Sequence, residues 1–508
     1  MLKKILRVIL SRRTVVVLLL LLQIFGLAFM LVHSGRASQV VSLLLTLVSY
    51  IVVIYIINRR DKPGFKLTWT ALILAFPLLG GILYLMFRIQ SSLSMMQRKF
   101  SKFECEIKSL LTQSDAVYDE VAQKMPDLLH EIDYLKNTVG YPVYRNTRTT
   151  YFSSGESAYA RMIEELKKAE SFIFLEYFII DDGEMWNTIH SILKQKAAAG
   201  VDVRIMYDDM GCLLTLPDQY ASTLKKDGIR CTAFNPFRPF WTTLQNNRDY
   251  RKICVVDGKV AFNGGFNIAD EYINRINRFG HWKDTAIMLE GDAVRSFTLM
   301  FLSMWTSSLN EKENFERFLP EYNCPGDGYV QPYSDNPTDD ETVGEFVYTQ
   351  LIQDARHYLY ISTPYLILDD SMIFSLQLAA KSGVDVRIIT PHIPDKKLVF
   401  LMTRSSYLEL IESGVRIYEY TPGFIHAKMF VSDDRTAVAG TANLDFRSLY
   451  LHFECGTRFY GGKVVSDIKK DFLDTLEQCT EITAEECKNR NLFVRLLQVL
   501  LRLAAPLM

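Results

Sequence analysis

The stretch Gly200-Val-Asp-Val-Arg-Ile205 is repeated without change at Gly383–Ile388, 183 residues further along the chain. Before each copy lies a helical pattern that carries Ala and Lys, and before that an apolar, β-rich run, Phe172–Ile180 or Tyr358–Ile367. Near-continuous apolar strands that alternate with helices are typical of a sheet that helices cover on both faces. The sequence therefore predicts two similar α/β halves, because a repeat this long indicates a duplicated domain and not a solenoid.

A second pair of matching segments follows the two hexapeptides. The first comprises Tyr250-Arg-Lys252, Asp257 and Gly264-Gly265-x-Asn267, and the second comprises His426-Ala-Lys428, Asp433 and Gly440-Thr441-x-Asn443. Residues i and i+2 of a strand share a face, so Tyr250 and Lys252 should point together into one site, as should His426 and Lys428.

A hairpin is predicted after each of these strands. Asp257-Gly258 is a strong signal for a two-residue loop, and Asp433-Asp434 occupies the matching place in the second half. Such loops would pair Lys252 with Asn263 and Tyr250 with Gly265, and likewise Lys428 with Ala439 and His426 with Thr441. The two aspartates would then lie in turns, where local hydrogen bonding is at least as plausible a role as catalysis.

The residue types in these segments suit a phosphodiester substrate. Lys and Asn side chains hold anionic oxygens, while an imidazole can attack phosphorus or protonate the departing alkoxide. This chemistry needs no metal, and no His, Asp or Glu cluster in the sequence has the spacing of a metal site. We therefore expect neither a metal nor another cofactor.

Charge and cysteine content narrow the function further. The chain has 57 Lys and Arg against 58 Asp and Glu, a formal net charge of -1, so it lacks the basic footprint of nucleic-acid-binding proteins. A nuclease is therefore disfavoured, and nucleic acid is not expected as a partner. The eight cysteines show no CxxC pair, which favours reduced and mostly buried thiols.

The amino end is predicted to be a membrane segment. Two apolar runs, Val15–Val32 and Val40–Ile57, are each close to the ~20 residues that span a bilayer. A cleaved signal peptide is the rival interpretation, because Gly35-Arg36-Ala37 is a small-x-small triplet. The first run is longer than the ~7–15 residues of a signal-peptide core and another run follows at once, so a helical hairpin is favoured.

The side of the membrane depends on a third apolar stretch, Leu67–Phe87, which Pro77 and Gly80-Gly81 interrupt. Basic residues before and after the hairpin place both of its ends in the cytoplasm. If the third stretch crosses, the remaining ~400 residues face outside; if it is re-entrant or interfacial, they stay in the cytoplasm, which the positive charges after it favour.

At these motifs the sequence resembles the phospholipase D superfamily, and with its membrane hairpin it is similar to the bacterial cardiolipin synthases of that superfamily. The resemblance covers nearly the whole chain. It implies two H-x-K-x4-D motifs that meet at one active site, where one histidine forms a covalent phosphohistidine and the other serves as general acid and then base. It also implies phosphatidyl transfer between two phosphatidylglycerol molecules, which releases glycerol.

The resemblance assigns roles residue by residue. His426, Lys428 and Asn443 match in the second half, and Lys252 and Asn267 match in the first. Glu454 stands where the superfamily has a carboxylate that orients the histidine, and Asp284 is its counterpart in the first half. The predicted catalytic set is Tyr250, Lys252, Asp257, His426, Lys428 and Asp433, with Asn267, Thr441 and Asn443 as phosphate ligands.

Tyr250 departs from the family pattern, which has histidine at this position. Unperturbed Tyr has a pKa of ~10 against ~6.5 for His, so it can donate a proton but shuttles protons less easily. Three outcomes are open: His426 is the nucleophile and Tyr250 assists as acid, Tyr250 or nearby His281 takes a larger part, or catalysis is weak or lost.

The sequence thus predicts a phosphatidyltransferase of the bacterial cell membrane, multi-pass, with phosphatidylglycerol and anionic membrane lipid as partners. A hydrolase and a weakened lipid-binding relative are the alternatives; the oligomeric state is left open. The expected parts are a membrane anchor (1–90), a helical connector (91–145), two halves (146–320 and 330–480) and an amphipathic carboxyl-terminal helix (481–508).

Overall fold

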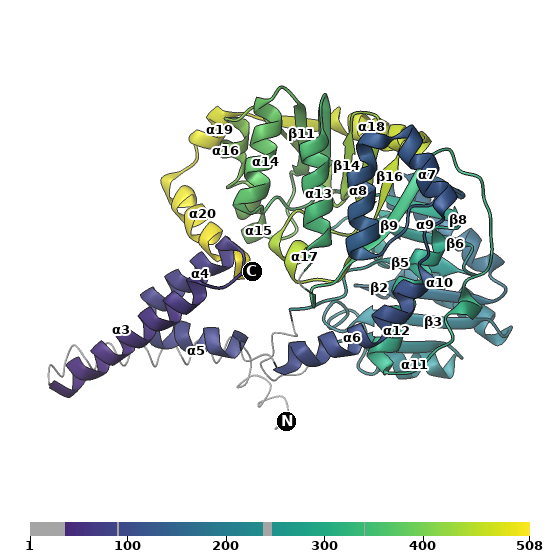
Figure 1. The fold of residues 1–508 in the computed structure, drawn as a ribbon, viewed down its shortest axis with the longest axis horizontal. Helices are drawn as coiled ribbons and strands as arrows, with labels where there is room; N and C mark the ends of the chain where they lie inside the picture. The colour runs from purple at the N-terminus through teal and green to yellow at the C-terminus, as the bar shows by residue number, and fades with distance from the viewer. Residues whose placement is uncertain (1–35, 89–90, 237–245, 340, 508) are drawn as a thin grey trace. The chain divides into compact units, whose positions relative to one another are not determined.

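The computed structural model describes residues 36–88, 91–236, 246–339 and 341–507, so the predicted apolar run Val15–Val32 lies outside it. The chain divides into two units (Figure 1). The smaller comprises Met1–Met95, Phe237–Asn246 and Val499–Met508, and the larger comprises Met96–Pro236 and Asn247–Gln498.

The smaller unit is helical. It contains α3 (Arg36–Ile57), α4 (Pro63–Ala75) and α5 (Pro77–Arg88), and receives the end of α20 (Leu492–Ala504) and η6 (Ala505–Leu507). Pro77 divides the predicted third stretch into α4 and α5, because a proline disfavours helical backbone at the residue before it and is favoured at the first position of a helix. Among the described residues, no helix combines the length and the apolar character needed to cross a bilayer.

The larger unit is built on two mixed sheets (Figure 1). The first contains β1 (Thr147–Phe152), β2 (Phe172–Tyr177), β3 (Asp202–Asp208), β4 (Arg230–Phe234), β5 (Ile253–Val256), β6 (Val260–Gly264) and β8 (Ala286–Gly291). The second contains β9 (Tyr329–Asp335), β10 (Tyr358–Ser362), β11 (Asp385–Pro391), β12 (Arg416–Tyr420), β14 (Met429–Ser432), β15 (Thr436–Gly440), β16 (Glu454–Tyr460) and β17 (Cys479–Ile482).

The two sheets have the same strand order. The first runs β4-β3-β2-β5-β6-β8-β1, the second runs β12-β11-β10-β14-β15-β16-β9, and β17 extends the edge of the second beyond β12. The two predicted α/β halves are therefore present, and each motif pair occupies equivalent strands.

Helices cover both faces of each sheet. The first half contains α9 (Gly155–Lys168), α10 (Glu184–Ala198), α11 (Tyr220–Lys226), η4 (Asp270–Ile273), α12 (Val294–Leu309) and η5 (Glu316–Phe318). The second contains α13 (Val343–Asp354), α14 (Asp370–Lys381), α15 (Lys397–Thr403), α16 (Tyr407–Ile411), α17 (Phe446–Tyr450), α18 (Lys463–Leu476) and α19 (Ala484–Lys488). The segment before them holds α6 (Ser91–Leu110), α7 (Asp115–Lys124), η1 (Pro126–Leu128), α8 (Leu129–Asp133) and η2 (Tyr134–Val139).

The largest core lies between the two sheets. Phe297 and Phe301 of α12 and Ile468 and Phe472 of α18 are buried in one cluster with residues of both sheets, such as Phe174. The outer faces are covered separately, by α9 and α10 on the first sheet and by α13 and α14 on the second. Because α12 and α18 are shared, the two halves pack as one body within the larger unit.

The repeated hexapeptide forms the turn from a helix into the strand after it. Gly200 and Gly383 have φ values of 92° and 95°, a left-handed conformation that suits the end of a helix and favours glycine. The valines and isoleucines that follow are buried in β3 and β11, which pair in parallel with β2 and β10. The repeat is thus explained by two identical helix-to-strand junctions.

The predicted register of the two hairpins is wrong by one residue. Ile253, and not Lys252, pairs with Asn263, and Met429, and not Lys428, pairs with Ala439. The tight turns form, with positive φ at Asp257-Gly258 and at Asp433-Asp434. One further residue, Lys259 or Arg435, then follows each turn before pairing begins, so each loop has three residues.

Candidate active site

The two motifs meet because each half contributes a segment to the other. Strand β7 (His281–Lys283) of the first half pairs in parallel with β13 (Gly423–Ile425) of the second. The backbone N–H of His426 donates to the carbonyl of Lys283 at 2.7 Å, and that of Tyr250 donates to the carbonyl of Phe453 at 3.0 Å. His426 therefore lies beside Lys283, which precedes Asp284. Tyr250 lies beside Phe453, which precedes Glu454.

His426 is held by a carboxylate from the opposite half. Its Nδ1 lies 2.8 Å from Oδ2 of Asp284, which is fully buried. A proton on Nδ1 leaves the Nε2 lone pair free to act as a nucleophile. Burial, followed by the charge of Lys428, lowers the pKa of His426 to about 4 against the opposing effect of Asp284, so the imidazole is neutral near neutral pH.

The predicted assignment of the carboxylates is corrected by this contact. Asp284 of the first half holds His426 of the second, whereas Glu454, which was expected to orient His426, accepts a hydrogen bond from Thr441 Oγ1 at 2.5 Å. The reason is the exchange of segments, which places each carboxylate beside the other half's motif. Position 265 must be glycine, because a Cβ there would lie 2.1 Å from Asp284 Oδ1.

The two motif lysines are buried near carboxylates of both halves, Asp284 and Glu454. Lys252 and Lys428 are 3% and 2% exposed, and each Nζ donates to the carbonyl two residues before it. Burial, together with the charge of Lys252, lowers the pKa of Lys428 to about 7, and burial also lowers that of Lys252. The effect of Lys252 on Lys428 indicates that both halves direct positive charge into one place, as binding of an anionic phosphate requires.

The two predicted asparagines differ in their contacts. Asn267 accepts from the Ile179 backbone N–H at 3.0 Å and donates to the Tyr272 hydroxyl at 2.7 Å. The Oδ1 of Asn443 is buried and has no hydrogen-bond partner within the described part of the chain. A free amide oxygen accepts a hydrogen bond, for example from a substrate hydroxyl, whereas only the Nδ2 of Asn443 can donate to a phosphate oxygen.

Tyr250 lies in a stack of three rings, with Phe178 from the first half and His452 from the second. Its ring is 3.8 Å from that of Phe178 and 4.0 Å from that of His452, the latter pair within 4° of parallel. Tyr250 and His426 are partly exposed, whereas Lys252 and Lys428 beside them are buried. Burial among these rings raises the pKa of the Tyr250 hydroxyl, so it remains protonated near neutral pH.

Asp257 and Asp433 fix the hairpin turns. The carboxylate of Asp257 accepts from the backbone N–H groups of Glu170, Ser171 and Phe172. Asp433 makes the same three contacts with residues 356–358 in the second half. Of the two roles open for these aspartates, the contacts support the structural one.

His281 does not face His426. Trp282 and Asp284 contact the His426 ring, and alternation along β7 directs His281 to the opposite face. There its Nδ1 lies 2.9 Å from the Tyr420 hydroxyl. The hypothesis of a direct role for His281 is therefore disfavoured.

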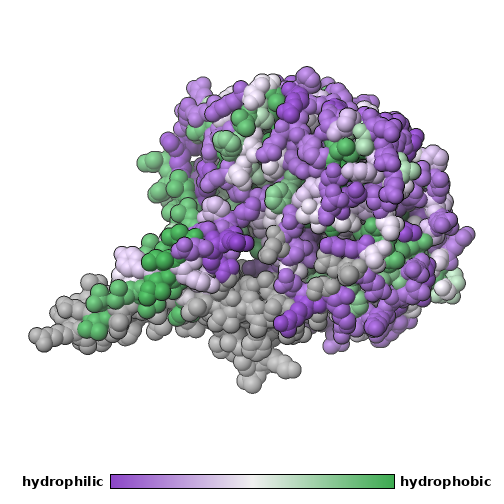
Figure 2. Space-filling model, viewed as in Figure 1, coloured by the Kyte–Doolittle hydropathy of each residue, from purple (hydrophilic) through white to green (hydrophobic). Residues whose placement is uncertain are grey.

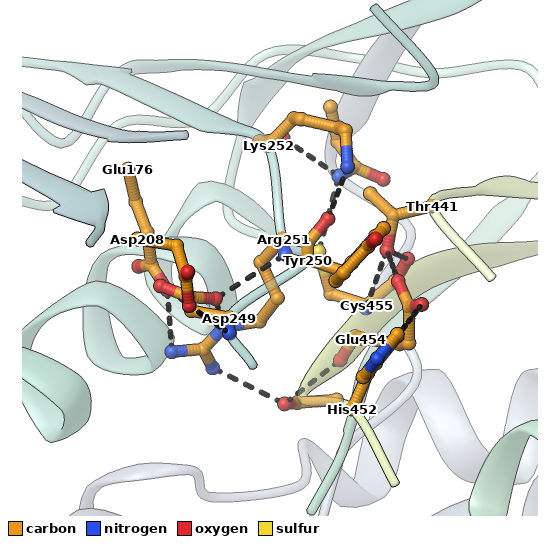
Figure 3. Close-up of polar contacts among 12 residues, drawn as sticks. Glu176, Asp208, Asp249, Tyr250, Arg251, Lys252, Thr441, His452, Glu454 and Cys455 are labelled. Atoms are coloured by element: carbon orange, nitrogen blue, oxygen red, sulfur yellow. Dashed lines mark hydrogen bonds and ion pairs between the residues drawn. The ribbon is translucent and has the colours of Figure 1, made fainter. Parts of the chain in front are cut away.

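A buried ion network supports the strand between Tyr250 and Lys252. Arg251 contacts Glu176 Oε1 at 2.6 Å and 2.7 Å and Asp249 Oδ1 at 3.5 Å, and it donates to the Ser334 hydroxyl (Figure 3). Glu176 is fully buried, so its place in an apolar strand is explained by an arginine partner. The network fixes the backbone from which Tyr250 and Lys252 project.

Sequence reasoning missed His452. It belongs to no motif, yet it lies against Tyr250 and its Nδ1 is 3.9 Å from Glu454 Oε1. A signal was present in the spacing: His452 precedes Glu454 by two residues, as Trp282 precedes Asp284.

Comparison with known proteins agrees with this geometry. A family model described as "Cardiolipin synthase, PLD-like domain" matches residues 162–305 and 348–476, and one described as "Phospholipase_D-nuclease N-terminal" matches residues 44–88. The chain is 46% identical to an uncharacterized protein of Streptococcus mutans, over 90% of this chain and 99% of that one. It is 33% identical to a cardiolipin synthase of Geobacillus thermodenitrificans, over 96% and 98% of the two chains.

A solved structure shares the fold. The phosphatidylserine synthase of Haemophilus influenzae superposes with a TM-score of 0.56 at 17% identity, over 71% of this chain and 93% of that one.

Proposed function

The chain belongs to the cardiolipin synthase family with phospholipase D-like domains, and from this premise we propose that it transfers the phosphatidyl group of one phosphatidylglycerol to another. The products would be cardiolipin and glycerol. The observation that carries the proposal is the neutral His426, held through Nδ1 by Asp284 beside two buried lysines.

The reaction would proceed in two displacements at phosphorus. In the first, His426 Nε2 attacks phosphorus, the bond to the glycerol oxygen breaks, and the Tyr250 hydroxyl gives its proton to that oxygen. In the second, a hydroxyl of another phosphatidylglycerol gives its proton to the Tyr250 oxygen and attacks phosphorus, and the nitrogen–phosphorus bond breaks. Each step leaves the proton count balanced.

The phosphate oxygens would be held by Lys252 and Lys428 together with Asn443, whose Nδ2 would donate to them. Both ammonium groups are already desolvated, so an anion that enters the site meets positive charge with little water to displace. Asn267 would contribute less to phosphate binding, because its side-chain oxygen and its NH₂ group already have hydrogen-bond partners. Thr441 would act through Glu454 and not on the phosphate directly.

Membrane attachment is part of this proposal. Apolar side chains are exposed on α3, including Leu43, Ile51 and Ile54, and on α20, including Phe493 and Val499. Figure 2 shows apolar surface over this helical part of the molecule. In α20, Arg495 and Arg502 accompany them without an acidic residue, which suits anionic headgroups. Two crossings by the hairpin, with the catalytic region on the cytoplasmic side, stay a prediction from the sequence.

Mass spectrometry of the lipids tests the activity. The purified full chain, incubated with phosphatidylglycerol in mixed micelles, is expected to give cardiolipin and glycerol in equal amounts. Phosphatidic acid in their place would identify a hydrolase and overturn the transferase proposal. No product at all would favour a lipid-binding relative that has lost its activity.

The pH dependence of kcat/KM should show two limbs that report on the free enzyme. The nucleophile must be neutral, so the rate should fall as pH falls through about 4, the pKa of His426. Lys428 must be charged to hold phosphate, so the rate should also fall as pH rises through about 7. Lys428→Arg, whose guanidinium stays charged, should remove the alkaline limb; an unchanged limb in this variant would contradict the assignment.

A further inference from the structure

The two carboxylate segments are equivalent by the internal repeat. His281-Trp-Lys-Asp284 supplies Asp284 to His426, and Leu451-His-Phe-Glu454 supplies Glu454 to the side of Tyr250. In this correspondence His452 takes the place of Trp282. The Trp282 ring lies 5.3 Å from that of His426 at 52°, whereas His452 lies flat on Tyr250.

The carboxylate does not hold Tyr250 as Asp284 holds His426. Glu454 Oε2 takes the Thr441 hydroxyl, and its Oε1 is buried without a hydrogen-bond partner among the described residues. Within the described ranges, the Tyr250 hydroxyl makes no hydrogen bond to Glu454. The rings of Phe178 and His452 stack on the Tyr250 ring, and Lys252 Nζ lies 5.0 Å from its centre.

His452 is itself buried and hydrogen-bonded through one ring nitrogen. It is 3% exposed, and its Nε2 accepts from Arg447 Nε at 3.4 Å. The proton must then lie on Nδ1, which faces Glu454 Oε1 at 3.9 Å. Burial, together with Arg447, holds the pKa of His452 well below its usual range, so it is a neutral ring and no proton carrier.

We propose that His452 is a positioning residue that replaces the missing carboxylate–histidine bond, because its ring, opposite Phe178, directs the Tyr250 hydroxyl to the leaving oxygen. This inference rests on the proposed function, in which Tyr250 gives its proton to glycerol as the phosphorus–oxygen bond breaks. A ring free to tilt would place the hydroxyl away from that oxygen, and a displacement of 1 Å costs on the order of 10²-fold in rate.

The test compares two donors that differ in their need for an acid. Phosphatidylglycerol loses an alkoxide, which needs a proton; a nitrophenyl phosphodiester loses a stable anion, which does not. His452→Ala should lower kcat on phosphatidylglycerol by ~10²-fold with little change in KM, and leave the single-turnover release of nitrophenol unchanged. His452→Phe keeps a ring and should restore most of the rate, because Arg447 is partly exposed and can turn to solvent.

A matched control is His190→Ala, which removes a histidine stacked on Trp186 at 5.4 Å and 4° elsewhere in the first half. It should not change the rate with either donor. Equal losses on both donors in His452→Ala, or no rescue by His452→Phe in a folded protein, would overturn the inference. A wild type that releases nitrophenol but makes no cardiolipin would instead refute the proposed function.

Discussion

His426→Ala is expected to abolish cardiolipin formation, with a loss in kcat of about 10⁴- to 10⁶-fold. The reason is that, in the proposed mechanism, the phosphatidyl group is bonded to Nε2 of His426 between the two displacements. Without it, the acceptor hydroxyl of phosphatidylglycerol would have to displace glycerol in one step. Both alcohols would then have to be bound at the phosphorus at the same time. The loss should appear in kcat and leave lipid binding nearly unchanged, because both lysines remain.

Trapping of the intermediate makes this prediction specific. Phosphatidylglycerol labelled at its phosphate should transfer label to the wild-type protein in a single turnover, and the bond should resist base and break in acid, as a nitrogen–phosphorus bond does. His426→Ala should take up no label. His281→Ala is the control, because that side chain faces Tyr420, and it should be labelled as the wild type is. Label retained in His426→Ala would remove His426 from the nucleophilic role.

Asp284→Asn should have the second largest effect, a fall in kcat of ~10²- to 10⁴-fold with a much smaller change in KM. The side chain keeps its shape, so packing against Gly265 is preserved. An amide can, however, present its NH₂ to Nδ1 of His426. The imidazole would then carry its proton on Nε2, where the lone pair is needed for attack.

Glu454→Gln offers the matched comparison on the other side of the site. Burial raises the pKa of Glu454 to about 8, so at neutral pH the acid is mostly protonated and the amide imitates it. The loss should therefore be far smaller than in Asp284→Asn, and kinetics of both variants at one pH would show the difference. Equal losses of kcat in the two variants would mean that both carboxylates have the same role in catalysis. Their different hydrogen-bond partners predict different roles.

The repeated features of the sequence predicted the fold well, because repetition separates structural signals from chance. Two copies of the hexapeptide indicated the helix-to-strand junctions, and two copies of the lysine motif indicated equivalent strands in the two halves. The hairpin register could not be predicted to the residue, since Asp257-Gly258 signals the turn but not whether Lys259 joins the loop.

Contacts between the halves were beyond the reach of the sequence. The family resemblance assigned Glu454 to His426, whereas the pairing of β7 with β13 places Asp284 there. His452 was overlooked for the same reason, because its importance comes from a ring in the other half. Patterns within a strand report which face a residue occupies, but not which distant residue will lie against it.

The crossing of the carboxylates also bears on how such an enzyme can evolve. Each half has a motif and a carboxylate, but that carboxylate lies beside the motif of the other half, so an ancestor with one half would complete its site only as a symmetric pair. In that pair a codon change from His to Tyr would have altered both positions and removed the nucleophile. Joined in one gene, the copies are free to drift apart, and the side that carries Tyr250 could change its proton donor while the side that carries His426 kept its chemistry.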